Sequence, residues 1–232
     1  MTRFEPTADV GSGAWIAPRL GGGFGAVGRV CPTGYEAYAR VFHPADGDAR
    51  PTTWAAVCAA TGRIAHPLMQ WHRISRDADG VQADGVEAAG RGIRDPATGW
   101  LGPDALAALA GALGADAALT VGLWHGYGFA YPHRGPMLAL PMREYVLYRG
   151  RLATLRDPGW LRTDGWAWAH GRTPNLVWPD DRSWFVASEI DFDSTVVGGS
   201  RALIERVLAS GLEAAEVTAA SDLSSEGDRL NP

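Results

Sequence analysis

Carboxylate side chains are densest in residues 184–193, where Glu189, Asp191 and Asp193 alternate with apolar residues. Side chains two residues apart on a β-strand share a face and lie about 6.5–7 Å apart. We therefore expect these carboxylates to repel one another unless a divalent cation, an arginine or water offsets their charge. The spacing suits a Mg²⁺ or Ca²⁺ site or a general acid/base pair on the outer face of a strand whose other face lies on the core. A solvated strand end is the structural alternative.

A tight turn and a helix are predicted directly after this strand. Gly198 and Gly199 permit the turn, and Ser200 is the expected N-cap of a helix over 201–209. Backbone N–H groups at such a turn can hold an anion, and Arg201 would assist. A plain connection between strand and helix is the alternative.

Glycines are also concentrated near the start of the chain. Gly23, Gly25 and Gly28 match the GxGxxG spacing of a dinucleotide-binding fingerprint. That fingerprint requires a long helix after the third glycine, and Pro32 and Gly34 would end it. We interpret the segment as a flexible glycine loop, with closure over a ligand as a secondary interpretation.

Aromatic and histidine side chains provide further candidates for a binding site. His125 and Tyr127 follow an apolar run and precede a glycine, a position that favours binding residues. A surface loop with an aromatic plug is the alternative. Trp166 and Trp168 lie in a glycine- and arginine-rich segment, where they would cover the sheet or line a groove.

The periodicities that would position these residues predict an α+β fold with a mixed, mostly antiparallel sheet. Two to four helices are expected to pack on one side of the sheet, with long Gly- and Trp-rich loops. Caps and apolar spacing predict helices over 53–61, 103–113 and 201–209. Apolar runs bounded by Gly or Pro predict strands over 35–42, 119–124, 137–140, 144–148, 152–155, 184–193 and 212–217.

The chain, 1–232, is predicted to form a single globular domain. A stretch rich in Asp, Gly and Ala, 75–102, has no clear periodicity and is where any boundary between two lobes is expected. Residues 1–13 and the segment from Ser221 onward are polar and are expected to be loose.

Composition excludes several function classes. All 21 residues of the Lys and Arg group are arginine, so no lysine can form a Schiff base or bind phosphate in a P-loop. The net charge of −5 argues against nucleic acid or an anionic membrane as the main partner, because such partners require a basic surface. No apolar run approaches the roughly 20 residues that span a bilayer, and no signal-peptide core is present. Cys31 and Cys58 form no CxxC motif, and we expect a cytoplasmic protein with free thiols.

Three runs resemble an uncharacterised family of actinobacterial proteins of similar length: AYARVFHPA (37–45), PNLVWPDDRSWFVASEIDFDSTVVGGSRALI (174–204) and EGDRLN near the end. The resemblance covers most of the chain and implies a self-contained protein, but it implies no activity, fold or site. The tryptophans placed in loops around a sheet are also similar to small α+β modules of the SUKH type.

Two main hypotheses follow. The first is a non-catalytic module that binds a protein or small molecule through its Trp-rich loops and acidic strand end, because Trp, Tyr and Arg dominate binding energetics. It needs no cofactor. The second is a divalent-metal-dependent hydrolase in which Glu189, Asp191 and Asp193 act as ligands or acid/base groups. In that enzyme His43 or His125 would assist, and Arg182 or Arg201 would hold an anionic substrate. An assembly role through a sheet edge at 212–217 is a third hypothesis.

Overall fold

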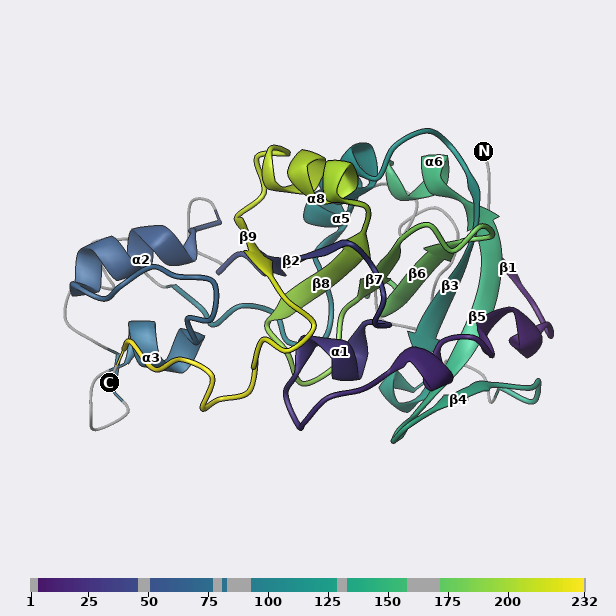
Figure 1. The fold of residues 1–232 in the computed structure, drawn as a ribbon, viewed down its shortest axis with the longest axis horizontal. Coiled ribbons are helices and arrows are strands. Elements are labelled where there is room, and N and C mark those ends of the chain that lie inside the picture. Colours follow the sequence, from purple (N-terminus) through teal and green to yellow (C-terminus); the bar gives the residue numbers. More distant parts are fainter. Residues whose placement is uncertain are drawn as a thin grey trace.

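A nine-stranded antiparallel sheet organises the structure, a computed structural model that describes residues 4–45, 51–76, 81–82, 93–128, 133–157 and 172–231 (Figure 1). The strand order is β1-β5-β3-β6-β7-β8-β2-β9, and β4 shares one edge of β5 with β1. The coarse prediction of an α+β fold with a mostly antiparallel sheet is confirmed. The strands are β1 (Glu5–Pro6), β2 (Ala37–Phe42), β3 (Ala118–Trp124), β4 (Leu138–Leu140), β5 (Arg143–Arg151), β6 (Leu176–Pro179), β7 (Phe185–Ala187), β8 (Ser194–Gly199) and β9 (Ala214–Val217).

The strands at the centre of the sheet are covered on both faces. Every residue of β2, β6, β7 and β8 is buried. β6 and β7 accordingly read as continuous apolar runs, LVWP and FVA, because neither face meets water. Their pairing joins distant parts of the chain, since β2 pairs with β8 from Ala37↔Gly199 to Phe42↔Ser194 and with β9 on its other edge.

Three helices pack on one face of the sheet: α5 (Pro103–Ala112), α6 (Leu152–Leu155) and α8 (Arg201–Leu208) (Figure 1). Pro occupies the first turn of α5, where its missing N–H costs nothing. The Ser200 side chain caps α8 by accepting from Leu203 N. Both helix starts were expected. The leucines of these helices form one cluster with β3, β5 and β8 residues such as Val121, Val146 and Val197.

The predicted strand over 152–155 is wrong, because this segment is helix α6. Asp116 fixes the start of the helix through two contacts. Its Oδ1 accepts from Ala153 N at 2.9 Å, and its Oδ2 accepts from Arg151 Nε at 2.6 Å. The signal for this helix therefore lies about 36 residues upstream, beyond the reach of local periodicity.

The opposite face of the sheet is covered by the chain before β2. This segment contains the 3₁₀ turns Val10–Gly13 and Ala17–Arg19 and helix α1 (Val27–Val30). Ile16, Val27 and Cys31 are buried there in a cluster that includes residues of β5, β6 and β7. The expectation of loose residues at the start is wrong for the described part, since Phe4 is buried and β1 pairs with β5.

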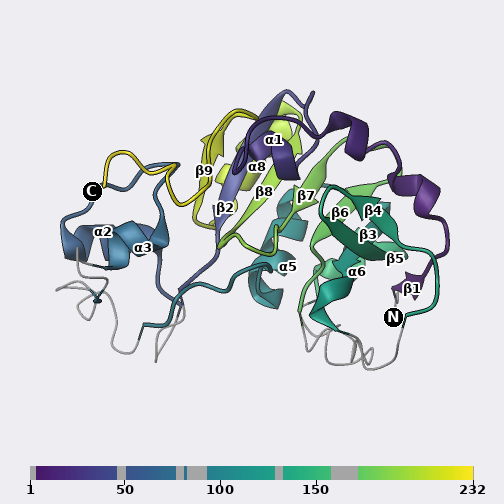
Figure 2. The same ribbon diagram turned by 90° about the horizontal axis from the view of Figure 1, so that it is seen from below.

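A third cluster lies beside the β2 and β9 end of the sheet, where Figures 1 and 2 both show α2 (Trp54–Thr61) and α3 (Trp71–Ser75). Its centre is formed by Phe42, Trp54 and Trp71, whose rings stack edge to face or tilted. Thr53 caps α2 and Gly62 ends it in the left-handed conformation, as expected.

The end of the chain closes this third cluster, so the expectation of a loose segment from Ser221 onward is wrong. Asp228 and Asn231 are buried. The Asp228 carboxylate accepts from Gln70 N and contacts the His66 ring at 2.8 Å. Asn231 bonds both the N–H and the C=O of Ile64 through its side-chain amide. These short polar side chains form hydrogen bonds with backbone N–H and C=O groups that would otherwise lack a backbone partner. This explains why a polar segment is ordered.

Residues 184–193 do not form one strand. β7 ends at Ala187, a turn follows, and β8 begins at Ser194. Phe192 N donates to Glu189 O at 2.9 Å within this turn. The alternation of apolar and acidic residues predicted a strand with one buried face and one exposed face. In the structure both faces of β7 are buried. Carboxylates on either face would therefore be buried at a high cost, so the strand ends before them. They lie in the turn instead.

Among the described residues, no helix is both long and apolar enough to cross a bilayer.

Candidate functional site

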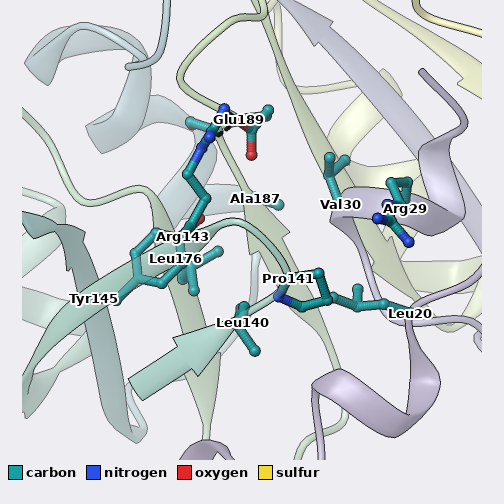
Figure 3. A pocket seen from close by; sticks show the side chains of 11 residues that line it. Leu20, Arg29, Val30, Leu140, Pro141, Arg143, Tyr145, Leu176, Ala187 and Glu189 are labelled. Atoms are coloured by element: carbon teal, nitrogen blue, oxygen red, sulfur yellow. Dashed lines mark hydrogen bonds and ion pairs between the residues drawn. The ribbon is translucent and has the colours of Figure 1, made fainter. Parts of the chain in front are cut away.

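An open pocket of about 400 Å³ lies between three turns of the chain. The turns are the glycine loop before α1, the β4–β5 turn at Pro141 and Met142, and the β7–β8 turn. We call it the three-turn pocket. A smaller recess continues from it toward the sheet, lined in part by Leu140, Tyr145 and Leu176 (Figure 3). The three-turn pocket is lined by Gly22, Phe24, Gly25, Arg29, Val30, Pro141, Met142, Arg143, Glu189, Asp191 and Phe192.

Two unusually exposed apolar side chains line this pocket. Phe24 is 93% exposed and Met142 is 82% exposed, the two highest values among the exposed large hydrophobic residues of the described chain. Apolar surface of this kind is costly in water and is typical of interaction sites. The pocket therefore offers an apolar lining that no other part of the described chain covers.

Met142 also adopts a strained backbone conformation. Its φ is 69°, a left-handed value that favours glycine. Met142 follows Pro141 in the two-residue connection between β4 and β5. Proline fixes φ near −65° at the first position, and the second position of a type II turn is normally glycine. A methionine in this strained conformation that also lines the pocket is a candidate for a role in the site.

The glycine loop presents Phe24 from a firmly anchored base. Val27 N and Gly28 N donate to Ser221 O and Ala219 O, and Leu223 N donates to Gly25 O. A Cβ at Gly25 would lie 2.6 Å from Ser224 Cβ, so glycine is required at this contact. The loop predicted from the sequence is therefore held at its base and projects Phe24 into solvent.

The acidic side of the pocket is built around Arg143. Arg143 Nη2 donates to Glu189 Oε1 at 2.9 Å and to Asp191 Oδ2 at 2.7 Å, and Nε donates to Glu189 Oε1 at 3.1 Å. Nη1 donates to Met142 O at 3.2 Å, which ties the cluster to the strained turn. The arginine is the counter-charge that the sequence reasoning required, and two of the three predicted carboxylates share it.

Asp193, the third predicted carboxylate, faces a different partner. Arg40 Nη2 contacts Asp193 Oδ1 at 3.4 Å, and the Arg40 side chain is buried. Burial raises the pKa of Asp193, and the Arg40 charge opposes that rise. In the described part of the chain, no group of three His, Cys, Asp or Glu side chains is arranged to hold a metal ion. The structure thus separates the residues of the metal hypothesis.

A buried polar chain runs behind the turn and includes His43. His43 Nδ1 lies 2.6 Å from Ala97 O, which can only accept, so Nδ1 carries the proton. Nε2 then accepts from the Thr195 hydroxyl at 2.8 Å, and the Ser188 hydroxyl donates to Thr195 Oγ1 at 2.6 Å. Burial lowers the pKa of His43 to about 4. These groups are buried and satisfied, which favours a structural role.

Tyr127 belongs to a second structural network. His125 is half-buried at the start of the 3₁₀ turn His125–Tyr127, which ends at Tyr127. The Tyr127 hydroxyl donates to Gly99 O at 2.7 Å and accepts from Asn175 Nδ2 at 3.0 Å. Asn175 also bonds Trp124 N and Ser188 O. Sequence reasoning missed Asn175, for which the only signal is a lone amide before the apolar run of β6.

The remaining predicted site residues lie apart from the three-turn pocket. Ser200 caps α8, and Arg201 N donates to the Glu36 carboxylate at 2.9 Å. The predicted anion site is thus occupied by a carboxylate of the chain itself. Arg201 Nη1 pairs with Glu216 at 2.8 Å, and Arg182 lies over the Trp15 ring. Trp166 and Trp168 lie outside the described residues.

No protein-family model, curated protein or solved structure matches the chain. The resemblances to an actinobacterial family and to SUKH-type modules remain predictions. Function must therefore be inferred from the geometry of the site.

Proposed function

We propose that this protein is a non-catalytic binding module and that its ligand occupies the three-turn pocket. The observation that carries the proposal is the pair Phe24 and Met142, exposed and lining one pocket with charged groups. A volume of about 400 Å³ lies within the range of about 300–1,000 Å³ that small-molecule sites occupy. The hydrophobic effect would supply affinity, and the charged side chains would supply orientation.

The lining of the pocket supports binding rather than catalysis. It contains no serine, cysteine or histidine that could act as a nucleophile or base within the described residues. Its Glu189 and Asp191 share one arginine, and the remaining carboxylate of the hydrolase hypothesis pairs with Arg40. The sequence-based expectations of a cytoplasmic location and of a ligand that is not nucleic acid are retained in this proposal.

The proposal is tested with N-phenyl-1-naphthylamine, a neutral aromatic fluorophore that brightens in apolar sites. We expect saturable fluorescence with the unmodified protein and a marked loss with Phe24→Ser and with Met142→Ser. Ile64→Ser is the matched control, because Ile64 is an exposed hydrophobic residue that does not line the pocket. Equal binding by all four proteins, each shown to be folded by circular dichroism, would contradict the proposal.

A further inference from the structure

We infer that the ligand of the three-turn pocket is a small zwitterion with an apolar body, the class to which short peptides with free ends belong. This inference rests on the proposed function and specifies it. The ammonium end would lie at Glu189 and Asp191, the oxyanion end at Arg29, and the apolar body between Phe24 and Met142.

The acidic side of the pocket has acceptors left over. Arg143 uses one oxygen of Glu189 and one oxygen of Asp191. Glu189 Oε2 and Asp191 Oδ1 have no hydrogen-bond donor among the described residues. The three side chains together carry a net charge of −1, because one guanidinium serves two carboxylates. An ammonium group, with three donors and one positive charge, matches both the unused oxygens and the residual charge.

Arg143 itself is not available to a ligand. Its Nε, Nη1 and Nη2 all donate to Glu189, Met142 O or Asp191. Its side chain is only 19% exposed. Arg143 is therefore a positioning residue that fixes the direction of the two carboxylates.

Arg29 provides the opposite charge across the pocket. It lies on α1, exposed, and faces the recess from the side away from Arg143 (Figure 3). Its guanidinium makes no hydrogen bond or ion pair with any other described residue. A guanidinium presents paired N–H groups that suit a carboxylate or another oxyanion. A simple cation would leave Arg29 unpaired, and a simple anion would face two carboxylates, so a ligand with both charges fits best.

Ala-Phe-Ala is a suitable probe, because at about pH 7 both ends are charged and the central side chain is apolar. The test compares the free tripeptide with its N-acetylated, C-amidated and doubly blocked forms. Binding is measured by titration calorimetry and by displacement of N-phenyl-1-naphthylamine. We expect the free tripeptide to bind and each block to weaken binding by about tenfold or more, as expected for loss of a charge-assisted hydrogen bond.

Matched variants assign each end to its side of the pocket. In Arg29→Gln the free and C-amidated peptides should bind equally, whereas N-acetylation should still weaken binding. In Glu189→Gln the N-terminal block should lose most of its effect and the C-terminal block should keep it. Such double-mutant cycles isolate the pairwise interactions from changes in folding.

The inference is overturned if all four peptides bind equally, or if none displaces a fluorophore that still depends on Phe24 and Met142. Either result leaves the proposed function standing. If the fluorophore itself binds without regard to Phe24 and Met142, the proposed function fails instead.

Discussion

Two arginine–carboxylate clusters flank the turn between β7 and β8. At one end Arg40 is buried and uses every guanidinium nitrogen: Nε donates to Ser194 Oγ, Nη1 to the carbonyls of Pro67 and Met69, and Nη2 to Asp193. At the other end Arg143 holds Glu189 and Asp191 at the wall of a pocket, with acceptors unused.

The difference lies in what covers each cluster. The Arg40 cluster is closed by Phe42 and Trp54, over whose rings its guanidinium lies at 4.6 Å and 5.3 Å. The Arg143 cluster is open toward Phe24 across the pocket. The same residue types thus serve stability where they are closed in and are available for recognition where they are open. Carboxylate spacing in the sequence does not distinguish the two cases.

The largest expected effect is from removing the buried arginine. Arg40→Met should lower the free energy of unfolding by about 3–5 kcal/mol, because it leaves Asp193 and two carbonyls without their donor. Arg143→Met, the matched change at the open cluster, should cost less, about 1–2 kcal/mol, because Asp191 is exposed and keeps its contact with water. Urea denaturation measures both. Equal losses would show that the two clusters do not differ as described.

The pH dependence of stability gives a second test of the buried side of this turn, through His43. Its folded pKa is about 4 against an ordinary value of 6.5, so the neutral form is favoured by folding. The stability that this provides is fully present above pH 6.5 and is lost as pH falls toward 4. Over that range the loss should reach about 3 kcal/mol. Unfolding free energies between pH 4 and 7 should therefore fall less steeply in His43→Gln, and parallel profiles would contradict this prediction.

A smaller effect is expected from a pair of isosteric changes two residues apart. Asp193→Asn should destabilise by about 1–3 kcal/mol, because it removes the only carboxylate that pairs with buried Arg40 in the described chain. Asp191→Asn changes an exposed side chain and should stay within about 0.5 kcal/mol. Thermal or urea unfolding distinguishes the two, and a reversed order would exclude the assignment of Asp193 to the closed cluster.

The smallest expected effect has the opposite sign. Met142→Gly should stabilise the protein by about 1 kcal/mol, because glycine adopts a φ of 69° without strain. The same change should weaken binding of N-phenyl-1-naphthylamine. Met142→Ala is the control, since it removes the side chain but keeps the strain. If glycine fails to stabilise relative to alanine, the strain at this turn has been overstated.

The sequence predicted those elements whose signals are local. Thr53, Gly62, Pro103 and Ser200 mark helix ends, and the apolar run before Trp124 marks β3, because caps and burial act within a few residues. The segment 152–155 was misassigned since its cap is Asp116, which is distant in sequence.

The candidate site could be predicted only in part, because its residues also come from segments that are distant in the sequence. Glu189 and Asp191 stood out as carboxylates, but their common partner Arg143 is 46 and 48 residues away. Phe24 was not predicted to be a site residue, because the sequence does not show whether a phenylalanine will be exposed or buried. The pocket forms only when three turns that are distant in the sequence come together in the fold. The periodicity of a single sequence does not show which distant turns will be neighbours.

The pairing of β2 has a consequence for the order of folding. Its partners β8 and β9 follow it by more than 150 residues, so both edges of this wholly buried strand stay unpaired until that long stretch has been synthesised. Contacts of such long sequence separation slow folding. Until they form, β2 is an apolar segment with unpaired edges, the type of segment that chaperones bind and that aggregates when they do not.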